Sequence, residues 1–207
     1  ETRFVASIDA DVELDSSWLE TLYSKMQKNK ITLIGGRMFE KYVDNPCNYW
    51  RSLRIAQQWG DEDILNPNFV FGCNNLLDTN NIEIRNIFNL QGEYFKTNGE
   101  DIEFSKYLKE KKLKIYYSSE SICYHLQDDD IKSLSNRYWR YLYYGDGFKK
   151  RNFIKTIKNM IRQFKKTIKW SLQDIFNLRL RLLKVNFGLL IYFCKLDYNH
   201  MKNKIYD

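Results

Sequence analysis

The N-terminal segment constrains the fold most, because apolar and polar stretches alternate there on the scale of single strands and helices. Phe4–Ile8 is a short apolar run that predicts a strand buried on both faces. An acidic turn then leads into Trp18–Lys28, where apolar residues recur at the spacing of an amphipathic helix. Ile31–Ile34 predicts a second strand, which two glycines close. Strand, turn, helix and strand in this order indicate an α/β unit.

The α/β pattern continues less regularly through residue 130. Asn66-Pro67-Asn68 marks a turn, and Gly72 follows a short apolar run that it closes. The further elements that we expect are a helix at 49–59, a strand at 69–71, a short helix at 82–88, a helix at 100–111, and strands at 114–117 and 121–125. The expected fold class is therefore α/β.

The composition excludes several classes of protein. Of the 207 residues, 43% are hydrophobic and 16% are aromatic, which excludes a disordered chain. The four cysteines (Cys47, Cys73, Cys123 and Cys194) are widely spaced and form no C-x-x-C pair. That spacing argues against a disulfide framework or a cysteine-based zinc site. It favours a reducing compartment, so we expect a cytoplasmic location.

Charge is divided sharply along the chain. Residues 1–130 contain 15 Lys and Arg against 22 Asp and Glu, a net charge of −7. Residues 131–207 contain 18 Lys and Arg against 4 Asp and Glu, a net charge of +14. The overall charge of +7 is therefore the sum of an acidic body and a basic tail, and the tail suits a polyanionic partner.

Two helices are expected in the basic tail. Apolar residues recur at helical spacing between Phe153 and Ile168, and lysines and arginines fill the other face. A second helical stretch covers about 172–196. Its most apolar run, Val185–Cys194, is too short to span about 30 Å of hydrocarbon as a helix.

Three interpretations of this tail stay open: a helical hairpin packed on the body, a membrane-surface anchor, and a nucleic-acid-binding element. The membrane interpretation is favoured over nucleic acid because the cations lie opposite a continuous apolar stripe. We therefore expect peripheral membrane contact through residues 150–195 and no nucleic-acid partner.

Several carboxylates and one histidine are candidates for chemistry. Asp9 and Asp11 leave the end of the first predicted strand, where they could share a divalent cation or simply form a solvated turn. Glu100 and Asp101 open a predicted helix, where a general base and a helix cap are both plausible. His125 ends a later strand and is either structural or a metal ligand. For Asp128-Asp129-Asp130 we expect only a solvated loop and a helix cap.

The order of these pieces resembles a known family. Five segments, spread over residues 3–145, resemble in order and spacing the second half of family 2 glycosyltransferases of the GT-A fold. They are SIDADVELDSSWLETL, LIGGRMF, FVFGCNN, NGEDIEFSKYLKEKKLKIYYSSESICYH and NRYWRYLYYG. The resemblance implies a partial GT-A mixed sheet with flanking helices. It implies a catalytic domain at 1–145, followed by the basic amphipathic tail at 146–207.

The same resemblance implies roles for individual residues. Asp9 and Asp11 correspond to the Asp-x-Asp pair that binds the metal–diphosphate of a nucleotide-sugar donor. The metal would be Mg²⁺ or Mn²⁺, and His125 corresponds to a histidine that joins this site in some members. Asp101 matches the general base, with Glu100 beside it. The donor's sugar pocket is implied to be lined by Gly72 and Asn74.

The resemblance also implies a reaction and its limits. One base without a second nucleophilic carboxylate implies inversion at the anomeric carbon. The Gln-x-x-Arg-Trp motif of processive members is replaced by Arg137-Tyr138-Trp139-Arg140, which favours addition of a single sugar. The implied acceptor is a surface glycan or glycolipid precursor of the cell envelope, met at the inner face of the cell membrane. The family's first nucleotide-binding βα units are expected ahead of Glu1, and a non-catalytic membrane-associated module or an inactive transferase fragment is the alternative.

Overall fold

A computed structural model describes residues 2–82, 99–145 and 153–204. The chain forms two compact units, which we call the sheet unit (residues 1–42 and 51–127) and the helical unit (residues 43–50 and 128–207). This division differs from the boundary expected at residue 145, because it assigns the helix Ile131–Gly145 to the helical unit. Leu134 and Tyr138 of that helix are buried, and the Tyr138 ring lies against that of Phe193.

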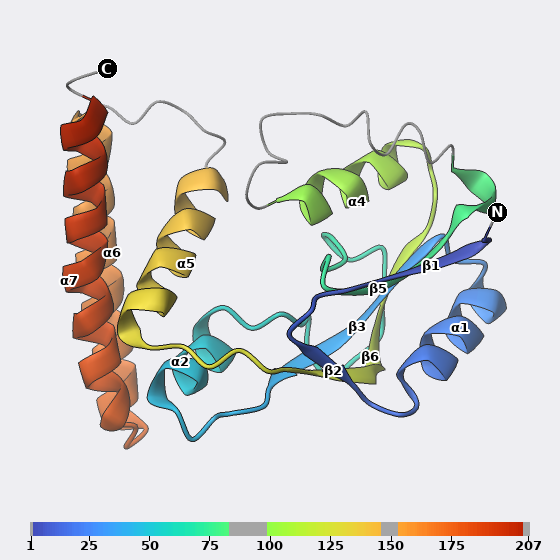
Figure 1. The fold of residues 1–207 in the computed structure, drawn as a ribbon, viewed down its shortest axis with the longest axis horizontal. Coiled ribbons are helices and arrows are strands. Elements are labelled where there is room, and N and C mark those ends of the chain that lie inside the picture. Colours follow the sequence, from blue (N-terminus) through green and yellow to red (C-terminus); the bar gives the residue numbers. More distant parts are fainter. Residues whose placement is uncertain (1, 83–98, 146–152, 205–207) are drawn as a thin grey trace. The chain divides into compact units, whose positions relative to one another are not determined.

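The sheet unit is built on a six-stranded mixed sheet (Figure 1). Its order is β1-β5-β3-β6-β2, and the two-residue strand β4 pairs with β6. The strands are β1 (Phe4–Ile8), β2 (Val12–Leu14), β3 (Leu33–Glu40), β4 (Ile64–Leu65), β5 (Asn74–Asp78) and β6 (Ile115–His125). β3 and β6 run parallel, whereas the other pairs are antiparallel. The expected α/β class is therefore confirmed at the level of a mixed sheet with flanking helices.

The first strand differs from its expected burial. β1 lies at the end of the strand order and pairs only with β5 among the described residues. Val5 and Ile8 are 43% and 40% exposed, so β1 is not buried on both faces as its apolar run suggested. An apolar run of this length shows that a strand forms, but its burial depends on which segments cover it.

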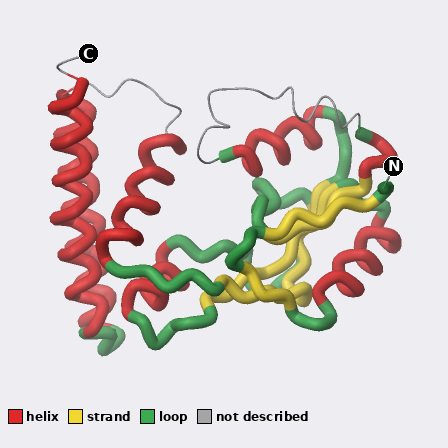
Figure 2. The backbone as a smooth tube through the Cα atoms, in the orientation of Figure 1, coloured by secondary structure: helices red, strands yellow, loops and turns green. Residues whose placement is uncertain are grey.

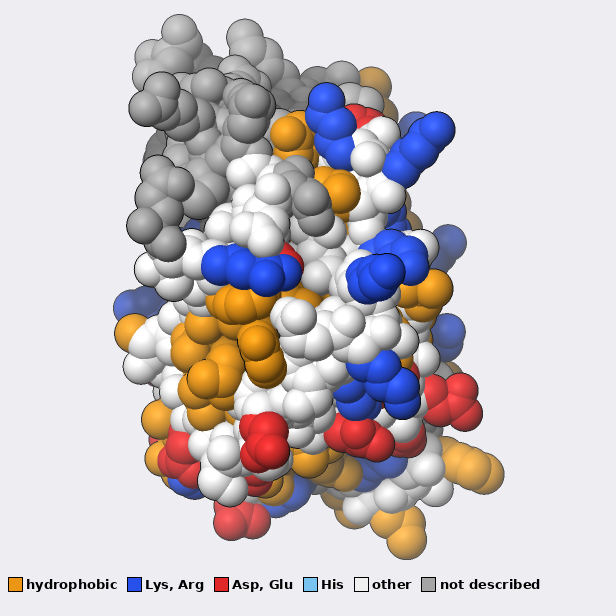
Figure 3. Space-filling view, turned by 90° about the vertical axis from the view of Figure 1, so that its right-hand side faces the viewer, with side chains coloured by type: hydrophobic (Ala, Val, Ile, Leu, Met, Phe, Trp, Pro, Cys, Tyr) orange, Lys and Arg blue, Asp and Glu red, His pale blue; other side chains and the backbone are white. Residues whose placement is uncertain are grey.

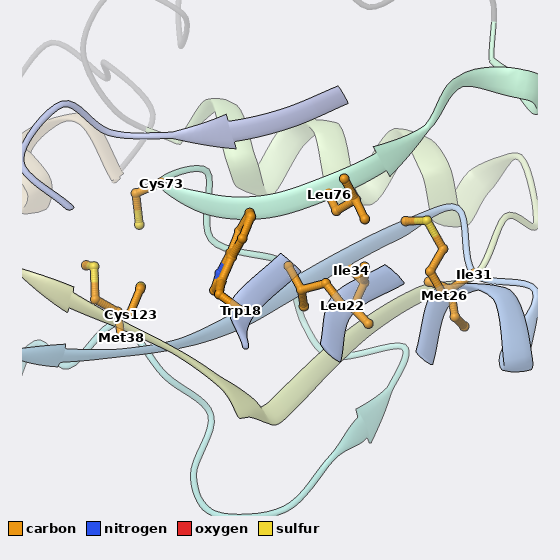
Figure 4. Packing of buried hydrophobic residues seen from close by; sticks show 9 residues of the cluster. All are labelled: Trp18, Leu22, Met26, Ile31, Ile34, Met38, Cys73, Leu76 and Cys123. Atoms are coloured by element: carbon orange, nitrogen blue, oxygen red, sulfur yellow. The ribbon is translucent and has the colours of Figure 1, made fainter. Parts of the chain in front are cut away.

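Helix α1 (Trp18–Asn29) covers one face of the sheet with an apolar stripe (Figure 4). Trp18, Leu22 and Met26 are at most 1% exposed, as expected for residues that recur every four positions on one helix face. The remaining residues of this core come from the sheet and its connections: Ile31, Ile34, Met38, Cys73, Leu76 and Cys123. Leu33 points to the opposite face from Ile34 because side chains alternate along a strand.

Helix α4 (Glu100–Glu110) covers the opposite face of the sheet. Leu108 packs there with Leu33 and Ile115 in a second buried cluster. Gly36, in the middle of β3, allows the strands to approach closely, because a Cβ at this position would lie 2.5 Å from the carbonyl oxygen of Ser121. The sheet is thus held between two helices that lie far apart in the sequence.

Several expected elements are displaced in the structure. The strand expected at 69–71 forms instead at β5, which begins after the Gly72 turn. The strands expected at 114–117 and 121–125 are one continuous strand, β6, with an irregular register opposite β3 between Gly35 and Arg37. A short 3₁₀ helix covers Thr79–Asn81. Most of the helix expected at 82–88 lies outside the described residues.

The helical unit consists mainly of three long helices (Figure 2). They are α5 (Ile131–Gly145), α6 (Phe153–Phe176) and α7 (Arg181–Lys204). The shorter helix α2 (Pro46–Arg54) begins in this unit, and its Trp50 donates a hydrogen bond from Nε1 to Asn186 Oδ1 at 2.8 Å. Among the described residues, the structure holds no helix long and apolar enough to cross a membrane.

Candidate active site

The Asp-x-Asp turn is fixed by the strands on either side of it. Asp9 follows β1, and its backbone N–H donates to the Cys73 carbonyl at 3.3 Å. The Asp11 carbonyl accepts from the Leu126 N–H at 2.8 Å, one residue after the end of β6. The turn therefore lies where β1, the Gly72 turn and the end of β6 meet.

Asp101, at the start of helix α4, lies beside the same Gly72 turn. Gly99 caps α4 with a φ of 102°, a left-handed conformation that glycine adopts without a steric penalty. Asp101 consequently stands in the first turn of α4, where its Cβ lies 3.6 Å from the position that a Cβ on Gly72 would occupy. The Gly72 carbonyl is held in turn by Ser7 Oγ and by Asn75 Nδ2, both at 2.9 Å.

The carboxylates at this site affect one another's ionisation. Burial raises the pKa of Asp101 to about 6, and the neighbouring charge of Glu100 adds to the rise. Burial also raises the pKa of Asp9, as do the charges of Asp11 and Glu100, whereas His125 lowers it. These interactions connect five predicted site residues, because Asp9 feels the charges of Asp11, Glu100 and His125, and Asp101 feels that of Glu100. Clustered acids with perturbed pKa values are typical of functional sites.

His125 is oriented by a buried carboxylate. Its Nδ1 lies 3.2 Å from Glu40 Oε2, and its Nε2 lies 3.4 Å from Asp11 Oδ2. Glu40 is paired with the buried Arg51, whose Nε donates to Glu40 Oε1 at 2.7 Å. Arg51 Nη2 also donates to the Gln127 carbonyl at 3.0 Å. Burial opposes ionisation of Glu40, but hydrogen bonds from His125 and Arg51 outweigh it and lower the pKa of Glu40.

This arrangement assigns the two ring nitrogens different roles. An ionised Glu40 only accepts hydrogen bonds, so the Nδ1 of His125 must carry a hydrogen. In the neutral ring, Nε2 then presents its lone pair toward the Asp11 carboxylate. Two acceptors that face each other at 3.4 Å can bind one cation between them.

The fit to a divalent cation is partial. Asp11 and His125 are near enough to bind one ion together, and a carboxylate behind a ligating histidine is the usual outer partner at metal sites. Among the described residues, no group of three or more His, Cys, Asp or Glu side chains is placed to hold a metal. The pair therefore fits a metal that takes its remaining ligands from water and from substrate phosphates, as Mg²⁺ commonly does.

The two residues predicted to line a sugar pocket, Gly72 and Asn74, lie in different surroundings. Gly72 lies in the site, beside Asp101. The Asn74 side chain, by contrast, is fully buried on the face of the sheet that α1 covers, and its Oδ1 accepts a hydrogen bond from Trp18 Nε1 at 2.5 Å. Its role in a donor pocket stays a prediction that the side chain's direction does not support. The expected helix cap is found at Asp130, whose Oδ1 accepts from the Ser133 N–H at 2.6 Å.

Sequence reasoning missed Glu40 and Arg51. Both are buried, with side chains 6% and 2% exposed. In the sequence, Glu40 stands beyond the predicted end of its strand, and nothing in the spacing links it to a histidine 85 residues away. Because β3 and β6 are parallel and in register, Glu40 becomes the direct neighbour of His125.

The sequence matches no protein-family profile and no curated protein. What the structure itself establishes is a mixed α/β sheet unit with clustered carboxylates at one end, and a basic helical unit.

Proposed function

We propose that this chain is a metal-dependent glycosyltransferase that moves a sugar from a nucleoside-diphosphate sugar to an acceptor hydroxyl. The observation that carries the proposal is the convergence of Asp9, Asp11, Asp101 and His125 from three separate segments. Its GT-A character rests on the resemblance of the five sequence segments. Reaction chemistry supports it too, because sugar transfer needs both a stabilised diphosphate leaving group and a base for the acceptor.

Asp11 and His125 would hold the cation, with Asp9 nearer the donor's ribose or a metal-bound water. A bound Mg²⁺ or Mn²⁺ would supply charge stabilisation to the departing diphosphate. Glu40 holds the imidazole by its Nδ1, so Nε2 stays directed toward Asp11. The main-chain hydrogen bonds of the turn keep Asp9 and Asp11 in place.

Asp101 would take the proton from the acceptor hydroxyl. Its pKa of about 6 leaves it largely ionised at neutral pH, yet basic enough to accept a proton. One such base gives a single displacement, and therefore inversion at the anomeric carbon. Glu100 raises the pKa of Asp101 through its charge, so it tunes the base rather than replacing it. We propose addition of one sugar per acceptor.

The acceptor that we propose is a surface glycan or glycolipid precursor. The acceptor class would place the enzyme in the cytoplasm, peripherally at the inner face of the cell membrane. A basic helical unit suits that location, because the cytoplasmic leaflet is negatively charged.

Removal of the Asp11 carboxylate tests the metal–diphosphate site. We expect Asp11→Asn to weaken Mn²⁺-dependent binding of a nucleoside diphosphate at least about 100-fold, because a direct ligand matters more than an outer-shell partner worth 10–100-fold. Isothermal titration with UDP and GDP, with and without Mn²⁺, measures this on the natural full-length chain.

The matched control is Asp44→Asn, an exposed carboxylate of the helical unit, which should bind as the parent does. Equal metal-dependent binding by Asp11→Asn and the parent would contradict the site. Absence of nucleotide binding by the parent under all metal conditions would favour the alternative, a non-catalytic membrane-associated module.

A further inference from the structure

Helix α6 packs with its polar stripe inward. The residues of α6 that are buried are Thr156, Asn159, Gln163, Thr167, Ser171 and Asp174. They recur every three or four positions and so share one face of the helix. An amphipathic helix of a water-soluble domain ordinarily buries its apolar face instead.

Polar contacts explain this inversion. Asn159 Nδ2 donates to Asp197 Oδ2 at 2.9 Å, and Asp197 Oδ1 accepts from Trp139 Nε1 at 2.7 Å. Further along, Asn186 Nδ2 donates to Asp174 Oδ2 at 2.9 Å. These pairs join α6 to α7, and α5 to α7, which lie side by side in the helical unit (Figure 1). Buried polar groups of this kind are costly unless they are satisfied, so they fix which face of α6 turns inward.

The apolar stripe of α6 is consequently exposed. Ile161, Phe164 and Leu172 are 50%, 54% and 62% exposed, which is unusual for a row of large apolar side chains. The full stripe is Ile154, Ile157, Ile161, Phe164, Ile168, Leu172 and Ile175. At about 1.5 Å per residue, it runs for about 30 Å along the helix.

The turn between α6 and α7 extends this apolar surface. Phe176 and Leu178 are 89% and 85% exposed, and Leu180 is 59% exposed. The turn is held in shape by the Arg179 N–H, which donates to the Asp174 carbonyl at 2.7 Å. Large apolar side chains therefore protrude from an ordered turn at one end of the stripe.

Cations flank the stripe along α6. Lys158, Lys165 and Lys169 are exposed on the adjoining face of α6. Between residues 153 and 204 the only acids are Asp174 and Asp197, and both are buried in the polar contacts described above. The face of the molecule shown in Figure 3, by contrast, carries acidic as well as basic side chains.

We propose that the exposed stripe of α6 and the 176–180 turn seat on the surface of an anionic lipid bilayer. The apolar side chains would enter the boundary between headgroups and acyl chains, and the lysines would contact anionic headgroups. This inference rests on the peripheral location proposed above. The exposed stripe and the 176–180 turn are the surface that would contact the membrane.

Charge decides between the bilayer and the other occupants. Two copies of α6 joined stripe to stripe would cover the apolar side chains but supply no anionic partner for the lysines, and in an antiparallel pair the two lysine rows would also repel each other. Nucleic acid would satisfy the lysines but leave the isoleucine and phenylalanine side chains in water. An anionic bilayer would bury the apolar side chains of the stripe and pair the lysines with anionic headgroups at the same time.

Vesicle co-sedimentation of the full chain tests the proposal. We expect binding to phosphatidylcholine–phosphatidylglycerol vesicles, and little binding to pure phosphatidylcholine. Phe164→Gln/Leu172→Gln should weaken binding about tenfold to a hundredfold, because each side chain loses apolar burial. Lys158→Gln/Lys165→Gln/Lys169→Gln should weaken it about a hundredfold at low salt. The matched control is Leu19→Gln/Leu65→Gln, which removes two equally exposed apolar side chains from the sheet unit.

Each outcome decides the proposal. Failure of the parent to bind anionic vesicles would overturn it, and so would apolar variants that bind as tightly as the control. A parent that is dimeric in solution, and that Phe164→Gln/Leu172→Gln makes monomeric without any vesicle binding, would assign the stripe to a second copy instead. Circular dichroism would confirm that each variant keeps its helices, as expected for substitutions at exposed positions.

A second readout locates the turn. An environment-sensitive fluorophore on Leu178→Cys, in a Cys194→Ser background, should shift to the blue on anionic vesicles, whereas the same label on Leu19→Cys should not. An unshifted label at position 178 would exclude insertion of the turn. Mn²⁺-dependent nucleotide binding, measured on the same variants, should be unchanged, so loss of membrane binding is distinguishable from failure of the transferase assignment.

Discussion

The Asp101→Asn variant is expected to bind the nucleotide-sugar donor as the parent does and to transfer sugar about 10²–10⁴-fold more slowly, the usual contribution of a general base. The amide keeps the shape of the side chain, and its oxygen can still accept the hydrogen bond that the Ile102 N–H donates to Asp101 Oδ1 at 2.8 Å. What it loses is the capacity to take a proton. Steady-state kinetics with separate measurement of donor affinity checks this.

The same substitution should stabilise the folded chain. Asp101 has a pKa of about 6 in the folded chain, raised from 3.8. The folded chain therefore binds a proton at this carboxylate more tightly than the unfolded chain does. Stability therefore falls as pH rises from about 4 to about 6, and the cost stays in place above that range. Asparagine never ionises, so Asp101→Asn should be more stable than the parent by about 3 kcal/mol at pH 7.5 and nearly equal to it near pH 4.

A pH profile and a neighbouring variant complete this test. In the parent, kcat/KM should rise with pH through a midpoint at about 6, as Asp101 ionises, and level off above about 7. Glu103→Gln, in the same first turn of α4, should retain both the activity and the profile. Turnover by Asp101→Asn at the parent's rate would exclude Asp101 as the base.

The second large effect is expected at the buried Glu40–Arg51 pair. Arg51→Met should destabilise the chain by about 3–5 kcal/mol, because it leaves a buried carboxylate without its cation. Arg51 Nη2 also donates to the Gln127 carbonyl, so the main chain beyond β6 loses a partner as well. Denaturant unfolding monitored by fluorescence measures the loss, and the melting temperature should fall by about 10 °C.

A double variant separates the lost charge pair from lost packing. Arg51→Met/Glu40→Leu removes both charges, so it should be more stable than Arg51→Met alone. His125 then loses its acceptor at Nδ1, and nitrogen NMR of the ring should show a changed tautomer or orientation. An Arg51→Met chain as stable as the parent would show that Glu40 is not held by this pair.

Much of the sheet unit was predictable because its signals are local. The periodicity of Trp18, Leu22 and Met26 defines α1 and its buried face, and the glycine before Glu100 marks the start of α4. The position of β5 was missed because Phe69–Phe71 is the more apolar segment, and only pairing with β1 and β3 selects Asn74–Asp78 as the strand. Backbone pairing is a long-range property that strand propensity does not encode.

The candidate site was predictable only where its signals are local in the sequence. Its carboxylates stand at the ends of strands and helices, so their positions were apparent from the chain. Glu40 became a partner of His125 only through parallel register. Asn74 and Asn75 are adjacent, and alternation along the strand sends Asn74 into the core while Asn75 supports the Gly72 turn.

The sequence by itself determined that the basic tail forms amphipathic helices, because helical periodicity is a property of neighbouring residues. It also determined the charge asymmetry and the chemical types available to the site. Only the tertiary structure decided which face of α6 is outward. Asn159 and Asp174 find their partners on α7, so the polar stripe turns inward and the apolar stripe remains exposed. That outcome depends on contacts between separate helices, which no single-helix pattern specifies.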